Sequence, residues 1–190
     1  MYKISKDFNL CYGHRVFTQS LNVDFCAKGD TKQKCRHLHG HEGKVTVHLE
    51  AEFVDNRGMV VDFKELGWLK DFIDEQLDHK FIIAAHDPMF DMLVTSVYDL
   101  AISKEPSYLP VYVPGCSAVG EVVDLAGIPA TMPEYETLEG YFIVDFVPTS
   151  ENLARWMYDL VAEKMSSFNV KVTCVEWAET PKSVARYYGG

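Results

Sequence analysis

A histidine-rich segment runs directly into an alternating one at residues 34–53, which read KCRHLHGHEGKVTVHLEAEF. In its second half every second residue is apolar, and this period of two is typical of a strand with one buried face. A strand that begins near Leu38 places His39 and His41 on the same face. At a rise of about 3.3 Å per residue, their two imidazoles can converge on one metal ion. The segment therefore predicts a strand with a candidate metal site at its start.

A third ligand must come from elsewhere in the chain, because zinc sites that do chemistry typically use three protein ligands and leave a fourth position open. His14 is the best candidate. Residues 2–17 predict a first strand in which His14 lies near the end of the apolar face. A neighbouring antiparallel strand would bring His39 and His41 beside it. The alternative is that His14 is a core histidine and that His39 and His41 merely lie at the entrance of a strand.

Length, charge and cysteine content narrow the class of protein. The chain has 190 residues, a net charge of −10 and five cysteines without a Cys-x-x-Cys pair. These values predict one domain without a disulfide framework or a four-cysteine zinc site. The acidic balance argues against nucleic-acid binding, and no apolar run has the length of a membrane span. The first residues lack the apolar core of a signal peptide, so we expect a cytoplasmic protein that does not bind membranes.

A local cluster of basic residues is the exception to the acidic balance. Lys28, Lys32, Lys34 and Arg36 lie directly before the histidines. The cluster is either a solvated loop or an anion site for a phosphorylated small molecule.

A turn and a helix follow the second strand. Residues 55–58 read Asp-Asn-Arg-Gly, a tight-turn sequence, and we expect a return strand to start at Met59–Val61. Asp62 fits the cap of a helix whose apolar residues recur at helical spacing up to Leu77. Asp78 and His79 end this helix. They are either a terminal polar pair or a proton relay, in which a carboxylate orients an imidazole.

The last third of the chain predicts a second helix and two more strands. Thr149 or Ser150 is the expected N-cap of this helix, and residues 170–180 and 184–188 are the expected strands. On the first of these strands Glu179 closes an otherwise apolar row. We predict an α+β fold with a four-stranded antiparallel sheet and two helices on one face. Residues 1–190 form a single domain, with an insertion at about 84–147 whose role does not follow from the sequence.

Several short motifs, taken together, resemble the 6-pyruvoyl-tetrahydropterin synthase superfamily, and more closely its bacterial queuosine-pathway branch. They occur in the order typical of that family and cover residues 1–83 and 148–190. The motifs are Gly13-His14-Arg15, Cys35-x-x-x-His39-Gly40-His41, Val61-Asp62-Phe63, Leu77-Asp78-His79, the run from Pro148 to Ala154, and Glu179-Thr180. The chain departs from the short form of the family in its long segment before Pro148 and in Ala178, where Lys is frequent.

The resemblance implies a role for each matching residue. His14, His39 and His41 would bind Zn²⁺, and Cys35 would be the base that abstracts a proton. Asp78 and His79 would form its relay, Glu179 would anchor the pyrimidine edge of a pterin, and Thr149 and Ser150 would line the pocket. The resemblance also implies the tunnelling fold and a homohexamer, a dimer of trimers with active sites between subunits.

The activity that the resemblance implies is a zinc-dependent lyase reaction. It would convert 7,8-dihydroneopterin triphosphate to 6-carboxy-5,6,7,8-tetrahydropterin and release acetaldehyde and triphosphate. The alternatives are the sister reaction that gives 6-pyruvoyl-tetrahydropterin, a non-catalytic pterin- or zinc-binding paralogue, and an aldolase-like activity on dephosphorylated substrate. The three residues between Cys35 and His39 resemble the carboxy-forming branch.

Overall fold

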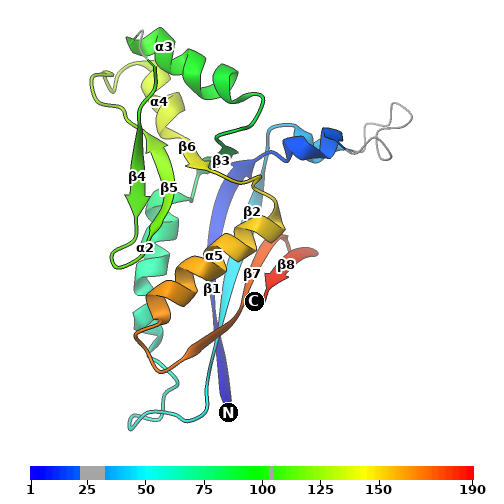
Figure 1. Ribbon diagram of the computed structural model, residues 1–190, viewed down its shortest axis with the longest axis vertical. Coiled ribbons are helices and arrows are strands. Elements are labelled where there is room, and N and C mark those ends of the chain that lie inside the picture. The colour runs from blue at the N-terminus through cyan, green and yellow to red at the C-terminus, as the bar shows by residue number, and fades with distance from the viewer. Residues whose placement is uncertain (22–32, 103–104) are drawn as a thin grey trace.

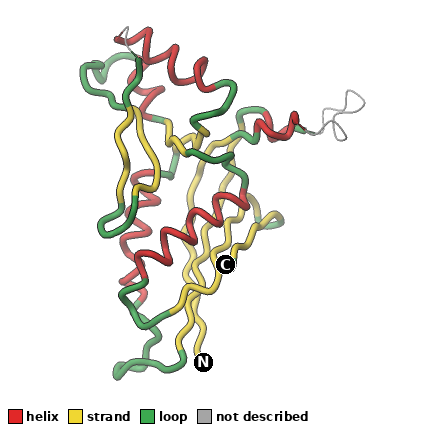
Figure 2. Tube along the Cα trace, in the orientation of Figure 1, coloured by secondary structure: helices red, strands yellow, loops and turns green. Residues whose placement is uncertain are grey.

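The computed structural model describes residues 1–21, 33–102 and 105–190. Within these residues the chain forms one mixed sheet with α-helices on both of its faces, an α+β arrangement (Figures 1 and 2). The α+β class predicted from the sequence is therefore confirmed. Lys28 and Lys32 of the predicted anion site lie outside the described residues.

Four antiparallel strands make up one half of the sheet. They are β1 (Tyr2–His14), β2 (His39–Ala51), β7 (Lys171–Thr180) and β8 (Ser183–Tyr187). β1 and β2 pair along their whole length, from Tyr2 opposite Ala51 to His14 opposite His39. The alternation seen in the sequence is the alternation between the core and the opposite face, since Val45, Val47 and Leu49 are buried in the core. Four of the five strands predicted from the sequence are therefore confirmed.

The loop after β2 confirms the predicted turn but not the return strand. Gly58 has a φ of 81°, which suits glycine, and its N–H donates to the carbonyl of Asp55 at 2.9 Å. Residues 59–61 form no strand. The Asp55 carboxylate instead accepts the N–H groups of Arg57 and Met59, so it closes the loop on itself. The prediction of a strand at Met59–Val61 is wrong because side-chain capping satisfies this backbone.

Two helices pack on one face of the sheet, as predicted. They are α2 (Gly67–Gln76), which follows a 3₁₀ helix at Phe63–Leu66, and α5 (Ser150–Met165). The Asp62 carboxylate caps the 3₁₀ helix, and the Thr149 hydroxyl caps α5 by accepting the Asn152 N–H at 3.3 Å. The apolar faces of both helices join the strands in one buried core.

The sheet has eight strands, so the prediction of a four-stranded antiparallel sheet is wrong. The additional strands are β3 (Lys80–Ala84), β4 (Tyr108–Tyr112), β5 (Ala118–Val123) and β6 (Tyr141–Val144). β3 runs parallel to β1 and β6 runs parallel to β3, which gives the order β4-β5-β6-β3-β1-β2-β7-β8. β3 and β6 are short and covered on both faces, so they carry no alternation that the sequence could reveal.

The segment between β3 and β6 covers the second face of these parallel strands. It includes α3 (Ser96–Ile102), which continues a π-helical turn at Asp91–Thr95, and α4 (Pro133–Glu139). These elements form a second core with Ile83 and Ile143, whereas Ile82 and Phe142 point into the first core. The residues whose role the sequence left open thus extend the sheet and give it a second layer.

Candidate metal centre and active site

Three histidines meet where β1 ends and β2 begins. His14 lies directly opposite His39 in the strand register, and His41 is opposite Tyr12. Each imidazole offers one nitrogen, and the three nitrogens lie within 4.8 Å of one another. The structure therefore brings together the three residues that the sequence singled out, at one end of the core face.

Hydrogen bonds fix the orientation of two of these rings. Nδ1 of His14 donates to the carbonyl of Pro148 at 2.6 Å, and Nδ1 of His39 donates to the carbonyl of His37 at 2.8 Å. A proton on Nδ1 leaves Nε2 as an acceptor. The Nε2 atoms of His14, His39 and His41 are all buried without a hydrogen-bond partner. Three converging imidazole nitrogens without a hydrogen-bond partner fit the ligand set of a zinc ion.

The surroundings of His14 and His41 favour the neutral form of these two imidazoles. Burial lowers the pKa of His14 to about 4, and burial also lowers the pKa of His41. The ring of Tyr12 packs against both, at centroid distances of 5.3 Å and 5.8 Å, and the indole N–H of Trp177 donates to the Tyr12 hydroxyl at 2.8 Å. Neutral imidazole is the form that binds a metal, so this burial favours metal binding by His14 and His41.

Two glycines allow the histidine strands to approach each other. Gly13 and Gly40 are opposite each other in the register, between the pairs that carry the histidines. A Cβ at Gly13 would lie 2.5 Å from a ring carbon of Phe81, and one at Gly40 would lie 2.9 Å from the carbonyl oxygen of Tyr12. No side chain fits at either position without moving its surroundings.

Glu179 lies beside the three histidines. Its carboxylate oxygens are 3.7 Å from Nε2 of His14 and 3.9 Å from Nε2 of His41. The β7–β8 register shifts between Ala178 and Thr180, so Glu179 is a bulge residue without a partner on β8. Bulges redirect side chains and are frequent next to active sites. The carboxylate is partly exposed, so it can reach a bound molecule as well as the histidines.

Asp78 and His79 form a hydrogen-bonded pair at the start of β3. Nδ1 of His79 lies 2.8 Å from one carboxylate oxygen of Asp78, and the other oxygen accepts the Cys11 N–H at 2.6 Å. Burial raises the pKa of Asp78, but the hydrogen bonds from Cys11 and His79 outweigh it, and the net pKa is lowered. His79 has a φ of 61°, an uncommon value for a residue with a side chain, and its imidazole is exposed.

Cys35 lies in a 3₁₀ helix, Lys34–Arg36, at the same end of the sheet as the histidines. Its carbonyl accepts the N–H of Val16, just beyond His14, at 2.7 Å. Within the described part of the chain, no hydrogen bond or ion pair joins Cys35 to Asp78 or His79. The single chain thus places the thiol near the histidines but does not connect it to the expected relay.

Thr149 and Ser150 follow the carbonyl that binds His14. Thr149 is the cap of α5 and Ser150 is its first residue, so their positions are fixed by the start of this helix. Pro148, which precedes them, is the hydrogen-bond partner of His14. The expected pocket residues therefore follow directly after the residue whose carbonyl orients His14.

A buried ion pair next to the centre was not predicted. Nε of Arg15 lies 3.0 Å from a carboxylate oxygen of Asp87, and both side chains are at least nine-tenths buried. The pair ties the end of β1 to the loop after β3, beside His14. Arg15 belongs to the Gly-His-Arg motif, but its partner is in the segment that sequence patterns did not resolve.

An open groove of about 620 Å³ is lined by residues from several of these motifs. Its lining includes Tyr12, Gly13, His39, His41, His79 and Phe81. Such a volume suits a small molecule, and the polar groups around it are typical of a binding site. Among the described residues, no helix has the length and apolar character to span a membrane.

Comparison with known families gives the class of this protein, a family of pterin-processing enzymes. A family model described as 6-pyruvoyl tetrahydropterin synthase matches residues 3–190, and the chain belongs to this family. The tunnelling-type fold expected from the sequence is thereby supported, although its sheet is larger than predicted.

Several individual relatives carry the name 6-carboxy-5,6,7,8-tetrahydropterin synthase. The chain is 28% identical to the 6-carboxy-5,6,7,8-tetrahydropterin synthase of Aquifex aeolicus (strain VF5), over 98% of this chain and 97% of the relative. It is 44% identical to an uncharacterized protein from Wolinella succinogenes, whose crystal structure matches with a TM-score of 0.81 over 100% of this chain and 98% of that one. The 6-pyruvoyl tetrahydropterin synthase of Caenorhabditis elegans matches with a TM-score of 0.51 at 18% identity, over 100% of this chain and 96% of that one, which shows a shared fold.

Proposed function

We propose that the protein is a zinc-dependent carbon–carbon lyase that converts 7,8-dihydroneopterin triphosphate to 6-carboxy-5,6,7,8-tetrahydropterin. One water molecule is consumed, acetaldehyde and triphosphate are the other products, and the reaction serves queuosine or other 7-deazapurine biosynthesis. The observation that carries the proposal is the set of three buried, unpartnered Nε2 atoms of His14, His39 and His41. The name of the Aquifex aeolicus relative supports the choice of reaction.

The three histidines would hold a zinc ion, which would supply Lewis acidity toward an oxygen of the substrate side chain. Cys35, as thiolate, removes the proton next to that oxygen. Asp78 holds the imidazole of His79 by the 2.8 Å hydrogen bond, so that His79 can pass protons to and from the reacting groups.

Glu179 orients the pterin in this proposal. A carboxylate accepts two parallel N–H groups from the edge of a pterin ring, and this bidentate contact fixes the position of the ring. Since its oxygens lie 3.7 Å and 3.9 Å from histidine nitrogens, the bound ring lies beside the metal ligands. Thr149 and Ser150 line the same pocket.

We also propose that the active site is shared between chains of a homohexamer, a dimer of trimers. Among the described residues no hydrogen bond or ion pair joins Cys35 to Asp78 or His79, and a relay from a neighbouring chain would supply this contact. β4 and β8 are the edge strands of the described sheet and offer unpaired backbone groups for assembly. Residues 84–147 remain, in this proposal, an insertion into a single domain.

The sister reaction that retains the three-carbon side chain is the second candidate, because the matching family model carries the name of that enzyme. Mass spectrometry after incubation with 7,8-dihydroneopterin triphosphate separates the two. We expect acetaldehyde in step with triphosphate and 6-carboxytetrahydropterin as the main pterin. Triphosphate without acetaldehyde would favour the pyruvoyl reaction, and no turnover would favour a binding paralogue.

A further inference from the structure

A second cluster of metal-ligating side chains lies on β2 and β7. His48, Cys174 and Glu176 each offer one ligand atom, and the three atoms lie within 4.8 Å of one another. His41 and His48 are seven residues apart on β2, about 23 Å at roughly 3.3 Å per residue. An odd separation along a strand places their side chains on opposite faces. The second cluster is therefore separate from the three-histidine centre.

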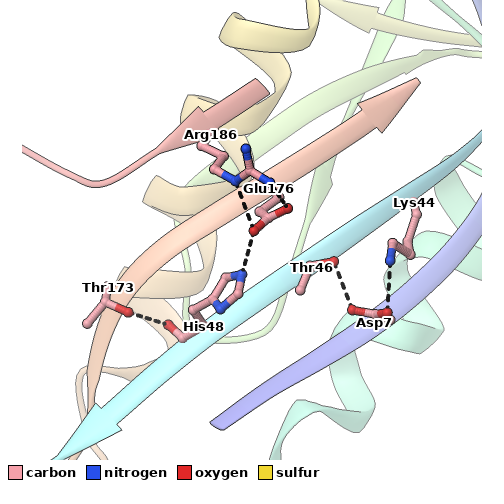
Figure 3. Close-up of polar contacts among 7 residues, drawn as sticks. All are labelled: Asp7, Lys44, Thr46, His48, Thr173, Glu176 and Arg186. Atoms are coloured by element: carbon pink, nitrogen blue, oxygen red, sulfur yellow. Dashed lines mark hydrogen bonds and ion pairs between the residues drawn. The ribbon is translucent and has the colours of Figure 1, made fainter. Parts of the chain in front are cut away.

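A β-bulge shapes this cluster. The β2–β7 register steps from His48 opposite Cys174 to Leu49 opposite Val172, so Thr173 has no partner on β2. The step turns Val172 into the core, while Cys174 and Glu176 stay on the face of His48. The Thr173 hydroxyl donates to the carbonyl of His48 at 3.4 Å and closes the bulge (Figure 3). Bulges of this kind commonly aim side chains at functional sites.

Arg186 forms an ion pair with Glu176, the carboxylate of this cluster. Figure 3 shows His48 and Arg186 both pointing at Glu176. Nε2 of His48 lies 3.0 Å from one oxygen, and Nε and Nη2 of Arg186 lie 3.1 Å and 3.2 Å from the two oxygens. The Arg186 side chain is 49% exposed and belongs to the edge strand β8. It can therefore leave the carboxylate for solvent without disturbing the core.

The ionisation of the metal-free cluster is consistent with an exchangeable cation. Burial raises the pKa of the Cys174 thiol, so the thiol is protonated near neutral pH. Burial also raises the pKa of Glu176, but hydrogen bonds from Arg186 and His48 outweigh it and keep the carboxylate ionised. The negative charge of Glu176 is balanced by Arg186.

We propose that His48, Cys174 and Glu176 form a second metal site for a divalent transition metal such as Zn²⁺ or Co²⁺, and that Arg186 competes with the metal for Glu176. Imidazole, thiolate and carboxylate form a ligand set that these ions accept, with a fourth position for water. Binding releases one proton from the Cys174 sulfur to solvent and frees Arg186. The metal ion, the thiolate and the carboxylate together carry no net charge.

Titration of the full chain with Co²⁺ tests this site. A thiolate bound to cobalt gives a charge-transfer absorption that the three-histidine centre cannot give. We expect the band in the wild type, in Cys35→Ala and in the matched control Cys116→Ala, but not in Cys174→Ala. His48→Gln should weaken binding at least about 100-fold, since even the outer partners of ligands are worth about 10- to 100-fold. Arg186→Ala should strengthen it about two- to fivefold, the value of an exposed ion pair.

Two results would overturn the proposal. One is a band that persists in Cys174→Ala or disappears in Cys35→Ala, because the thiolate would then belong to another site. The other is the absence of any band in the wild type at millimolar Co²⁺. If circular dichroism shows that Cys174→Ala is unfolded, Arg186→Ala decides: tighter binding supports the site, and unchanged or weaker binding refutes it.

Discussion

The two histidine clusters on β2 differ in what their nitrogen atoms contact. At the start of the strand, the Nε2 atoms of His39 and His41 are buried without a hydrogen-bond partner, as is that of His14, and Glu179 comes no closer than 3.7 Å to those of His14 and His41. Further along, Nε2 of His48 contacts Glu176, which also holds Arg186. A buried polar atom without a partner costs about 1–3 kcal/mol. The first cluster therefore needs a ligand, whereas the second is already balanced by its own charges.

This contrast teaches that residue type alone does not identify a metal site. Both clusters have three candidate ligands within 4.8 Å. The first offers lone pairs at no electrostatic cost, but the second must lose a proton and release an arginine before it binds. We expect the first cluster to bind metal more tightly and to control activity.

The largest effect is expected when the first cluster loses a ligand. His39→Ala should lose its zinc and at least about a thousandfold in turnover, because Lewis-acid stabilisation is worth several kcal/mol and about 1.4 kcal/mol is tenfold in rate. His48→Gln is the matched variant on the same strand, and it should retain one tightly bound zinc per chain. Elemental analysis of both purified proteins checks the contrast. Equal zinc loss in the two variants would erase the difference between the clusters.

The next effect concerns the thiol near the first cluster. Cys35→Ala should keep zinc and fold but lose at least about a hundredfold in turnover, the low end of general acid–base contributions. Cys116→Ala removes a thiol that packs against the core and lies 4.0 Å from the carbonyl of Leu160, so it is the control. Steady-state kinetics with both variants measures the effect. A fully active Cys35→Ala enzyme would assign the thiol a packing role.

A smaller effect is expected at Glu179, whose carboxylate lies beside the histidines. Glu179→Gln should raise KM about 10- to 100-fold, because hydrogen bonds to a charged group are worth about 1.5–3 kcal/mol. The zinc content should not change, since Glu179 is not one of the three ligands. Kinetics and metal analysis on the same sample separate substrate anchoring from metal binding. Zinc loss without a change in KM would place Glu179 in the metal centre instead.

The smallest effect is on stability, in the metal-free protein. The pKa of His14 is about 4 in the folded chain and about 6.5 in an unfolded one, so the unfolded state binds more protons between these values. The free energy of unfolding should therefore fall as the pH is lowered from about 6.5 to about 4. Urea unfolding across this range measures it, and His14→Asn should flatten the dependence. A wild-type stability that rises on acidification would contradict a buried neutral His14.

The antiparallel half of the fold could be predicted because its strands have one core face and one polar face. Val45, Val47 and Leu49 alternate with polar residues, and this period of two predicts a strand with one buried face. β3 and β6 are buried on both faces, and their apolar runs do not separate strand from buried helix. The eight-stranded order depends on these contacts between distant segments.

In the candidate site, too, only some of the residues could be predicted from the sequence. His39 and His41 are two residues apart on one strand, so their convergence follows from strand geometry. Pro148, whose carbonyl fixes His14, and Asp87, which pairs with Arg15, are remote in sequence, and no sequence pattern shows that they contact these side chains. Only the tertiary structure brings them to the histidines.

X-ray absorption at the zinc edge, on the full chain loaded with one equivalent of zinc, tests the three-histidine centre most directly. The account predicts three nitrogen ligands at about 2.0–2.1 Å with multiple scattering from imidazole rings, and no sulfur. A sulfur shell at about 2.3 Å would contradict it, because a thiolate such as Cys174 or Cys35 would then hold the ion in place of a histidine.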